Sequence, residues 1–229
     1  MIFSPLKSGK TVEENEIESF KTDFSHKKYL YLMGGTHGDE VEGVYVMAQL
    51  FKWLQSDHSI SELPIIAIPI LNVDGYRAGT RVNSHAVDLN RNYPTKDWSG
   101  EFKKKKNNPG PSALSEPENI YLEKLFKKFP PGFIITFHSW KPILNFNGDA
   151  ADVAEYISSY NQYPVEGDIG YPTPGSLGTY MPEKFDCPVL TYECPVLDDN
   201  ITLKSIWEQN EEGLKSLLQG ELIRKKLNL

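Results

Sequence analysis

Residues 29–54 read YLYLMGGTHGDEVEGVYVMAQLFKWL, a short apolar run followed by a polar turn and a helical pattern. The run YLYLM (29–33) is nearly all apolar, which is typical of a strand that is buried on both faces. From Val41 onwards, apolar residues recur at the 3.6-residue period of one helix face, namely Val44, Tyr45, Ala48, Phe51 and Leu54. The stretch therefore predicts a buried strand that leads through a turn into a helix.

The same alternation of strand and helix patterns extends along the chain. Three more runs have the length and composition of buried strands: IIAIPIL (65–71), FIITF (133–137) and PVLTY (188–192). Helices are predicted over 150–160, after Asp199 or Asn200, and after Ser115, which is expected to form a capping box with Glu118. This order indicates an α/β sandwich with a largely parallel or mixed sheet, in which ligands bind at the carboxyl ends of the strands.

Composition narrows the class of protein further. With 229 residues, 39% hydrophobic and 24% charged, the chain is expected to form one globular domain over residues 1–229 and neither a disordered nor a disulfide-stapled protein. A net charge of -7 argues against a nucleic-acid partner. The lack of a basic start with an apolar run, and of any long apolar stretch, predicts a cytoplasmic protein without a membrane partner. Cys187 and Cys194 are expected to be small buried residues in a reducing compartment. The sequence leaves open whether the protein forms a homodimer.

Ionisable side chains stand where the predicted strands end. His37 and Glu40 follow the first strand, His138 follows FIITF, and Glu193 follows PVLTY. Burying such groups without partners costs several kcal/mol, so their grouping at one sheet edge favours a site over packing, although any single histidine could be a satisfied structural one. A trio of His, Glu and His is a set of zinc ligands that leaves one coordination position for water, as catalytic zinc sites do.

The stretch between the second and third predicted strands is rich in polar residues. LNVDGYRAGTRVNSHAVDLNRNYP (71–94) contains Arg81, Asn90 and Arg91. A guanidinium group can bind a carboxylate through two hydrogen bonds or stabilise an oxyanion, and asparagine adds a neutral donor. The alternative is that these arginines form surface ion pairs.

An ordered series of motifs resembles the zinc carboxypeptidases of the carboxypeptidase A type. The motifs are GGTHGDE, NVDG, TRVN, VDLNRN, SEPE, FHS and TYE, and they cover about residues 30 to 195. The resemblance implies a three-layer α/β/α sandwich around a mixed sheet of about eight strands. NVDG replaces the more usual NPDG, and Ala86 replaces a glycine, but neither change removes a functional group.

The resemblance also implies a role for each site residue. His37, Glu40 and His138 bind one Zn²⁺ per chain, and Glu193 is the general base that activates the zinc-bound water. Arg81 stabilises the oxyanion, Asn90 and Arg91 hold the terminal carboxylate of the substrate, and Asp88 orients the His37 ring. Tyr171 is expected to be the active-site tyrosine, with Tyr180 as the alternative. Ser176 and Leu177 fall near the specificity pocket.

Within this family, LNFNGD after the third ligand and YPTPGS before the base resemble the bacterial murein-peptide amidases. That resemblance implies a small peptide substrate with a free C-terminal carboxylate, cut between γ-D-glutamate and meso-diaminopimelate during cell-wall recycling. The alternatives with the same zinc site are a general metallocarboxypeptidase and an N-acyl-amino-acid deacylase, similar to succinylglutamate desuccinylases and aspartoacylases. From another class, the alternative is an inactive peptide-binding protein that retains zinc.

Overall fold

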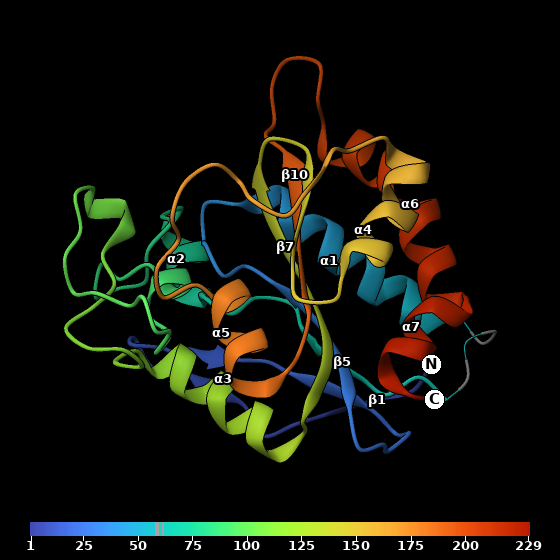
Figure 1. Ribbon diagram of the computed structural model, residues 1–229, viewed down its shortest axis with the longest axis horizontal. Coiled ribbons are helices and arrows are strands. Elements are labelled where there is room, and N and C mark those ends of the chain that lie inside the picture. Colours follow the sequence, from blue (N-terminus) through green and yellow to red (C-terminus); the bar gives the residue numbers. More distant parts are fainter. Residues whose placement is uncertain (58–59, 61) are drawn as a thin grey trace.

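An eight-stranded mixed sheet forms the middle layer of the protein (Figure 1), whose computed structural model describes residues 1–57, 60 and 62–229. The strand order is β1-β4-β6-β5-β7-β10-β8-β9. The strands are β1 Phe3–Pro5, β4 Phe20–Thr22, β5 Tyr29–Gly34, β6 Ile65–Ile68, β7 Pro131–Trp140, β8 Ile143–Asn147, β9 Val165–Glu166 and β10 Val189–Pro195. A separate two-stranded sheet pairs β2 Gly9–Lys10 with β3 Glu16–Ile17.

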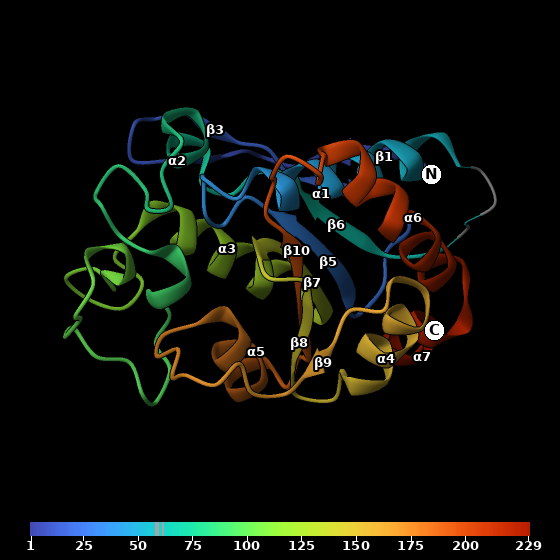
Figure 2. The same ribbon diagram turned by 90° about the horizontal axis from the view of Figure 1, so that it is seen from above.

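Helices cover both faces of this sheet, as Figure 2 shows from above. On one face lie α1 Val41–Ser56, α4 Ala151–Asn161, α6 Leu203–Gln219 and α7 Glu221–Leu227; towards the other lie α2 Val73–Ala78, α3 Pro117–Lys128 and α5 Leu177–Phe185. Short 3-10 turns span Leu89–Arg91 and Lys105–Asn107. The predicted three-layer sandwich is confirmed. None of the helices in the described ranges combines the length and the apolar character needed to cross a bilayer.

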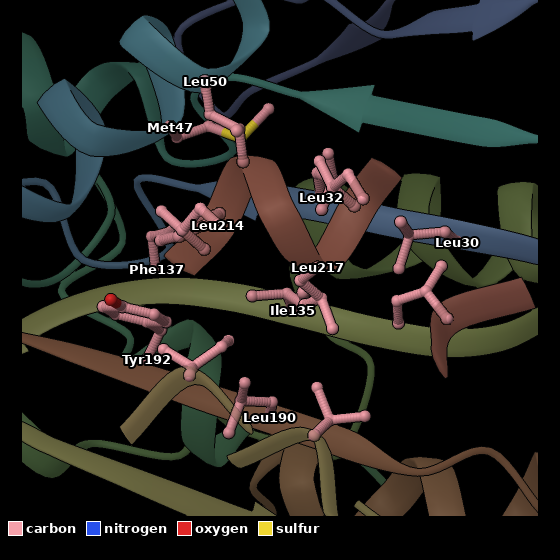
Figure 3. Packing of buried hydrophobic residues seen from close by; sticks show 14 of the residues in the cluster. Leu30, Leu32, Met47, Leu50, Ile135, Phe137, Leu190, Tyr192, Leu214 and Leu217 are labelled. Carbon is pink, nitrogen blue, oxygen red and sulfur yellow. The ribbon is translucent and has the colours of Figure 1, made fainter. Parts of the chain in front are cut away.

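The four apolar runs of the sequence form the four central strands. β6, β5, β7 and β10 pair in parallel, so that Leu32 lies beside Ile135 and Val189 beside Ile134. Figure 3 shows the core on the α1 and α6 face, where Leu32 and Ile135 of the sheet belong to one apolar cluster with Met47 of α1 and Leu217 of α6. The parallel strands β5, β7 and β10 end at the same edge of the sheet, and this edge holds the predicted site. Both cysteines are buried and unpaired, as expected.

The buried face of α1 agrees with the predicted one only in part. Val44, Phe51 and Leu54 are buried as predicted, whereas Ala48 is exposed and Tyr45 is half-buried, and Met47 and Leu50 are buried as well. Apolar residues surround most of this helix, so periodicity alone could not select the face that meets the sheet.

The start of α3 also differs, and the predicted capping box is wrong. Glu116 is the N-cap residue and makes no side-chain cap bond, and the helix begins at Pro117. The Glu118 side chain instead accepts a hydrogen bond from Asn83 Nδ2 at 3.2 Å, and Ser115 Oγ donates to Glu116 at 2.7 Å. A partner distant in the sequence has displaced the local cap, which a sequence pattern cannot reveal.

This buried glutamate makes stability depend on pH. Burial raises the pKa of Glu118 from 4.5 to about 6, and nearby Glu116 adds to the rise. Its stabilising contribution is therefore present below pH 4.5 and is lost as pH rises to 6. Glu118→Gln, which keeps an acceptor for Asn83, is expected to raise the free energy of unfolding by about 2 kcal/mol at pH 8 and far less at pH 4.5.

Urea unfolding of the chelator-treated protein at both pH values measures this difference. The matched control is Glu155→Gln on the exposed side of α4, which should change neither value. Equal effects of the Glu118 substitution at pH 4.5 and pH 8 would show that its burial carries no ionisation cost.

Candidate metal centre and active site

Two of the predicted ligands come from the turn between β5 and α1, and the third comes from the adjacent strand. The turn after Gly34 presents His37 and ends at Glu40, the N-cap residue of α1. His138 lies within β7, which pairs in parallel with β5. All three side chains are buried, with at most 9% of each residue exposed. The strand pairing thus brings together residues that are a hundred positions apart in the sequence.

The ligand atoms of these three residues converge. Glu40 Oε1 lies 2.7 Å from His37 Nδ1, Glu40 Oε2 lies 2.7 Å from His138 Nδ1, and the two Nδ1 atoms are 3.2 Å apart. Across the described part of the chain, no other three His, Cys, Asp or Glu side chains come together in this way. Two imidazole nitrogens and a carboxylate are the donor set of catalytic zinc sites, so the residues present fit a divalent metal.

The electrostatics of the cluster also favour a cation. Burial lowers the pKa of His37, but Glu40 and Asp88 reverse this effect and raise it to about 9. Burial raises the pKa of Glu40, yet His37 and His138 hold it well below its usual range. The buried carboxylates thus attract positive charge to the space between the rings, whether the charge is a proton or a metal ion.

Asp88 supports the first ligand from behind. Its fully buried carboxylate accepts a 2.9 Å hydrogen bond from His37 Nε2. With its proton on Nε2, the His37 ring presents the lone pair of Nδ1 to the cluster. Burial raises the pKa of Asp88, but His37 and Arg81 hold it below its usual value, so this carboxylate stays ionised.

Arg81 reaches the same cluster from the loop that follows α2. Its Nη1 donates to Glu40 Oε1 at 3.0 Å, and its Nη2 donates to Asp88 Oδ2 at 3.0 Å. Its side chain keeps 23% of its surface exposed. The guanidinium group is therefore held by two carboxylates of the cluster, and the side chain remains partly exposed.

Glu193 lies beside the ligands because of strand register. β10 pairs in parallel with β7, and Glu193 is directly opposite His138. Its Oε2 atom is buried and has no hydrogen-bond partner among the described residues. Burial raises the pKa of this carboxyl, with Glu40 adding to the rise and His138 opposing it. An unpartnered carboxylate with a raised pKa is suited to accepting a proton.

Arg91 is a buried cation without a carboxylate partner among the described residues. It is only 7% exposed, and its Nη1 donates to the backbone carbonyl of Asn90 at 2.6 Å. Burial lowers the pKa of this guanidinium group. Since a buried charge is costly unless it is paired, Arg91 is arranged to receive an anion.

The remaining predicted residues, Asn90, Ser176 and Leu177, lie near the start of α5 and have different surroundings. Asn90 Oδ1 accepts a 2.8 Å hydrogen bond from Leu177 N, which ties the loop to the start of α5. Ser176 Oγ caps this helix by accepting from Thr179 N, and Leu177 is buried in the apolar cluster under α3 and α5. Ser176 and Leu177 therefore shape this region, but their side chains are engaged in the fold.

The structure separates the two candidate tyrosines. Tyr180 is 2% exposed, and its hydroxyl donates to Glu123 Oε2 of α3 at 2.8 Å, so it lies in the core. Tyr171 is 47% exposed; burial raises its pKa, Arg91 lowers it and Glu193 raises it, so it lies within the field of the site. Of these two tyrosines, Tyr171 is therefore the accessible one.

Two contributors to the site were not predicted. The backbone N–H of Ser139 donates to Glu40 Oε2 at 3.2 Å and helps to fix this ligand. Trp140, at the end of β7, is 43% exposed and lies edge-on to Tyr171, with ring centroids 5.9 Å apart. In the sequence, Trp140 could have been noticed only as an aromatic residue two positions after His138 in FHSW.

Comparison with known proteins decides the family. Residues 2–167 match the zinc carboxypeptidases, which covers the three ligands and Arg91 but not Glu193. The chain belongs to the zinc carboxypeptidase family. Since this is a family of metallopeptidases, the chain is a hydrolase.

Relatives with curated names agree with this membership. The chain is 26% identical over 232 residues to murein peptide amidase A of Vibrio campbellii, covering 96% of this chain and 89% of the relative. It is 27% identical over 181 residues to murein peptide amidase A of Escherichia coli K12, covering 74% and 72%. In each match the covered shares of the two chains are similar and exceed two thirds, so the chain and these relatives share most of their extent.

Solved structures confirm the fold. The crystal structure of murein-tripeptide amidase from Escherichia coli O157 superposes with a TM-score of 0.75 at 23% identity, covering 95% of this chain and 92% of that one. Carboxypeptidase A from Helicoverpa armigera gives a TM-score of 0.81 at 17% identity, covering 99% and 69%. The mixed eight-stranded sheet with helices on both faces is therefore that of the zinc carboxypeptidases.

Proposed function

We propose that this protein is a zinc-dependent amidase that releases meso-diaminopimelate from the murein tripeptide L-Ala-γ-D-Glu-meso-diaminopimelate. In this proposal residues 1–229 act as one catalytic domain in the cytoplasm, during recycling of the cell wall. The observation that carries it is the meeting of a buried His37, Glu40 and His138 trio with the unpartnered carboxylate of Glu193. The names of the curated relatives support this choice of substrate.

Each residue then has one task. His37, Glu40 and His138 would hold one zinc ion, which supplies Lewis-acid polarisation of the scissile carbonyl and lowers the pKa of water. Glu193 accepts the proton of the attacking water and passes it to the leaving amine. Arg81, whose side chain remains partly exposed, donates to the oxygen that gains negative charge.

The substrate end of the site is proposed to bind the free C-terminal carboxylate. Arg91 offers a buried guanidinium group with no carboxylate partner among the described residues, and its neighbour Asn90 would add an amide donor. A bidentate bond between Arg91 and the carboxylate fixes the scissile bond relative to Glu193. Tyr171 is proposed to close over the bound peptide, since it is the exposed tyrosine on which the charges of the site act.

Cleavage of the tripeptide by the purified, zinc-loaded protein tests the proposal. Release of meso-diaminopimelate should occur, stop when a chelator is added and return with zinc. Release of C-terminal residues from ordinary α-linked peptides alone would assign a general carboxypeptidase, and cleavage of N-acyl amino acids alone would assign a deacylase. Prolonged binding of intact peptide would support the inactive binding protein, against which the presence of Glu193 argues.

Removing the charge behind His37 is expected to weaken metal binding. Asp88→Asn keeps the size of the side chain but loses the negative charge that orients and polarises the His37 ring. Zinc affinity, measured by competition with a chelator of known affinity, should fall about 10- to 100-fold. Asp152→Asn, on the partly exposed side of α4, is the control and should leave the affinity unchanged. Unchanged affinity in the Asp88 variant would remove that residue from the support of the metal.

A further inference from the structure

The loop of residues 81–92 carries four of the side chains that the proposed function uses, yet it has little regular structure. Arg81, Asp88, Asn90 and Arg91 all lie on it, and its one described helical segment is the 3-10 turn Leu89–Arg91. Misplacing a catalytic or binding group by about 1 Å can cost on the order of 100-fold in rate. The backbone of this loop must therefore be held from outside.

The first turn of α3 holds the beginning of the loop. Asn83 Nδ2 donates to Glu116 Oε2 at 2.7 Å and to Glu118 Oε2 at 3.2 Å. Asn83 Oδ1 accepts from the backbone N–H groups of His85 and Val87 at 3.1 and 3.0 Å. One amide thus shapes the turn with its oxygen and binds two carboxylates with its nitrogen, a combination that only an amide side chain offers.

The same turn of α3 also holds the middle and the end of the loop. Asn119 Nδ2 donates to the carbonyl oxygen of Leu89 at 2.9 Å. Asn92 Oδ1 accepts from the backbone N–H of Glu116 at 3.3 Å, and Asn92 Nδ2 donates to Ser115 Oγ at 3.0 Å. Residues 115–119 therefore contact the loop at three points, at 83, 89 and 92.

The polar cluster of Asn83, Glu116 and Glu118 is a costly way to hold a helix in place, because it buries two carboxylates. Glu116 and Glu118 are 1% and 0% exposed, and both bind the same amide nitrogen. His85 Nδ1 lies 2.9 Å from Glu116 Oε2, but its own side chain is 57% exposed. Burying two carboxylates destabilises a fold unless their bonds are well satisfied, whereas apolar packing would hold α3 without this cost.

We propose that the first turn of α3 positions the 81–92 loop for substrate binding, through the side chains of Asn83, Glu116, Glu118 and Asn119. Arg81 lies two residues before the first contact point, at Asn83. Arg91 lies between the second and third contact points, at Leu89 and Asn92. The SEPE motif, which has no part in the chemistry, thereby gains a role. This inference rests on the proposed function, because it takes these arginines to face substrate.

Asn83→Asp tests the proposal with little change in shape. The new side chain keeps the acceptor for the His85 and Val87 N–H groups, but it places a third carboxylate against Glu116 and Glu118. Amide hydrogen exchange in residues 81–92 should accelerate at least tenfold, and KM for the tripeptide should rise about tenfold. The double variant Asn83→Asp with Glu118→Gln restores a donor between the two side chains, and should recover most of both losses.

Asn161 of α4 provides a matched control. Asn161 and Asn83 are both 3% exposed. Asn161 Oδ1 accepts from the backbone N–H of Tyr163 at 3.0 Å, and its Nδ2 donates to two side chains, as Asn83 Nδ2 does. Asn161→Asp should lower stability, yet leave both the hydrogen exchange of 81–92 and KM unchanged. Should Asn83→Asp fail to fold, Asn119→Ala, which loses only the bond to Leu89, is expected to speed exchange at 89–91 and raise KM about fivefold.

Two results would overturn the positioning role. One is a folded Asn83→Asp or Asn119→Ala protein whose residues 81–92 exchange amide hydrogens at the wild-type rate. The other is a double variant whose exchange rate and KM are no closer to wild type than those of Asn83→Asp alone. Exchange needs no substrate, so its outcome stands apart from the proposed function. A wild-type protein that releases no diaminopimelate would reject that function and would leave the exchange result intact.

Discussion

Glu193→Gln is expected to lower kcat for the tripeptide by about 10²- to 10⁴-fold while zinc stays bound. Glutamine has nearly the same shape, but it cannot accept a proton from the attacking water. Glu193 lies opposite His138 on the neighbouring strand and is not one of the three converging ligands, so the metal cluster should survive the change. Steady-state kinetics and elemental analysis of the same preparation measure the two quantities together.

The control for this substitution is a glutamate of the same chain that lies away from the site. Glu155→Gln, on an exposed position of α4, should retain wild-type kcat and zinc. A Glu193→Gln protein with turnover within threefold of wild type would show that another group serves as the base. Loss of zinc from this variant would instead place Glu193 among the ligands.

His138→Ala is expected to remove both the metal and the activity. The substitution leaves only His37 and Glu40, from a single turn, and two ligands do not hold zinc in competition with a chelator. Because a ligand that binds only the folded state stabilises it by about 2.7 kcal/mol at a concentration 100 times its Kd, added zinc should raise the Tm of the wild type and not that of the variant.

Thermal unfolding with and without zinc, beside kinetics, distinguishes this effect from general damage. His26→Ala is the control, since the His26 ring stacks on Phe24 and bonds with the backbone of Lys28, and His26 is not one of the three converging residues. It should keep the zinc response. A His138→Ala protein that still responds to zinc and cleaves substrate would contradict the assignment of this ligand.

Much of the central sheet could be predicted because its strands are short, nearly all-apolar runs. YLYLM, FIITF and PVLTY are buried on both faces, so their composition alone separates them from surface segments. The outer strands β1, β8 and β9 and the short helices α2 and α5 have no such signal. They are two to nine residues long, and the three strands are defined by pairing with other segments of the chain.

The meeting of the three candidate metal ligands could be predicted because these residues flank those same runs. The sequence could not show that His138 and Glu193 lie inside their strands, paired in register. Nor could it separate Tyr171 from Tyr180, because the bond that draws Tyr180 into the core is to Glu123 of α3. The error at Ser115 has the same origin, since the partner of Glu118 is 35 positions away.

The most direct test of the account is anomalous X-ray diffraction at the zinc edge from crystals of the zinc-loaded protein. One strong anomalous peak per chain is expected, within about 2 to 2.2 Å of His37 Nδ1, His138 Nδ1 and a Glu40 oxygen. A zinc-loaded crystal with no peak between these three side chains, or with zinc bound only elsewhere, would contradict it.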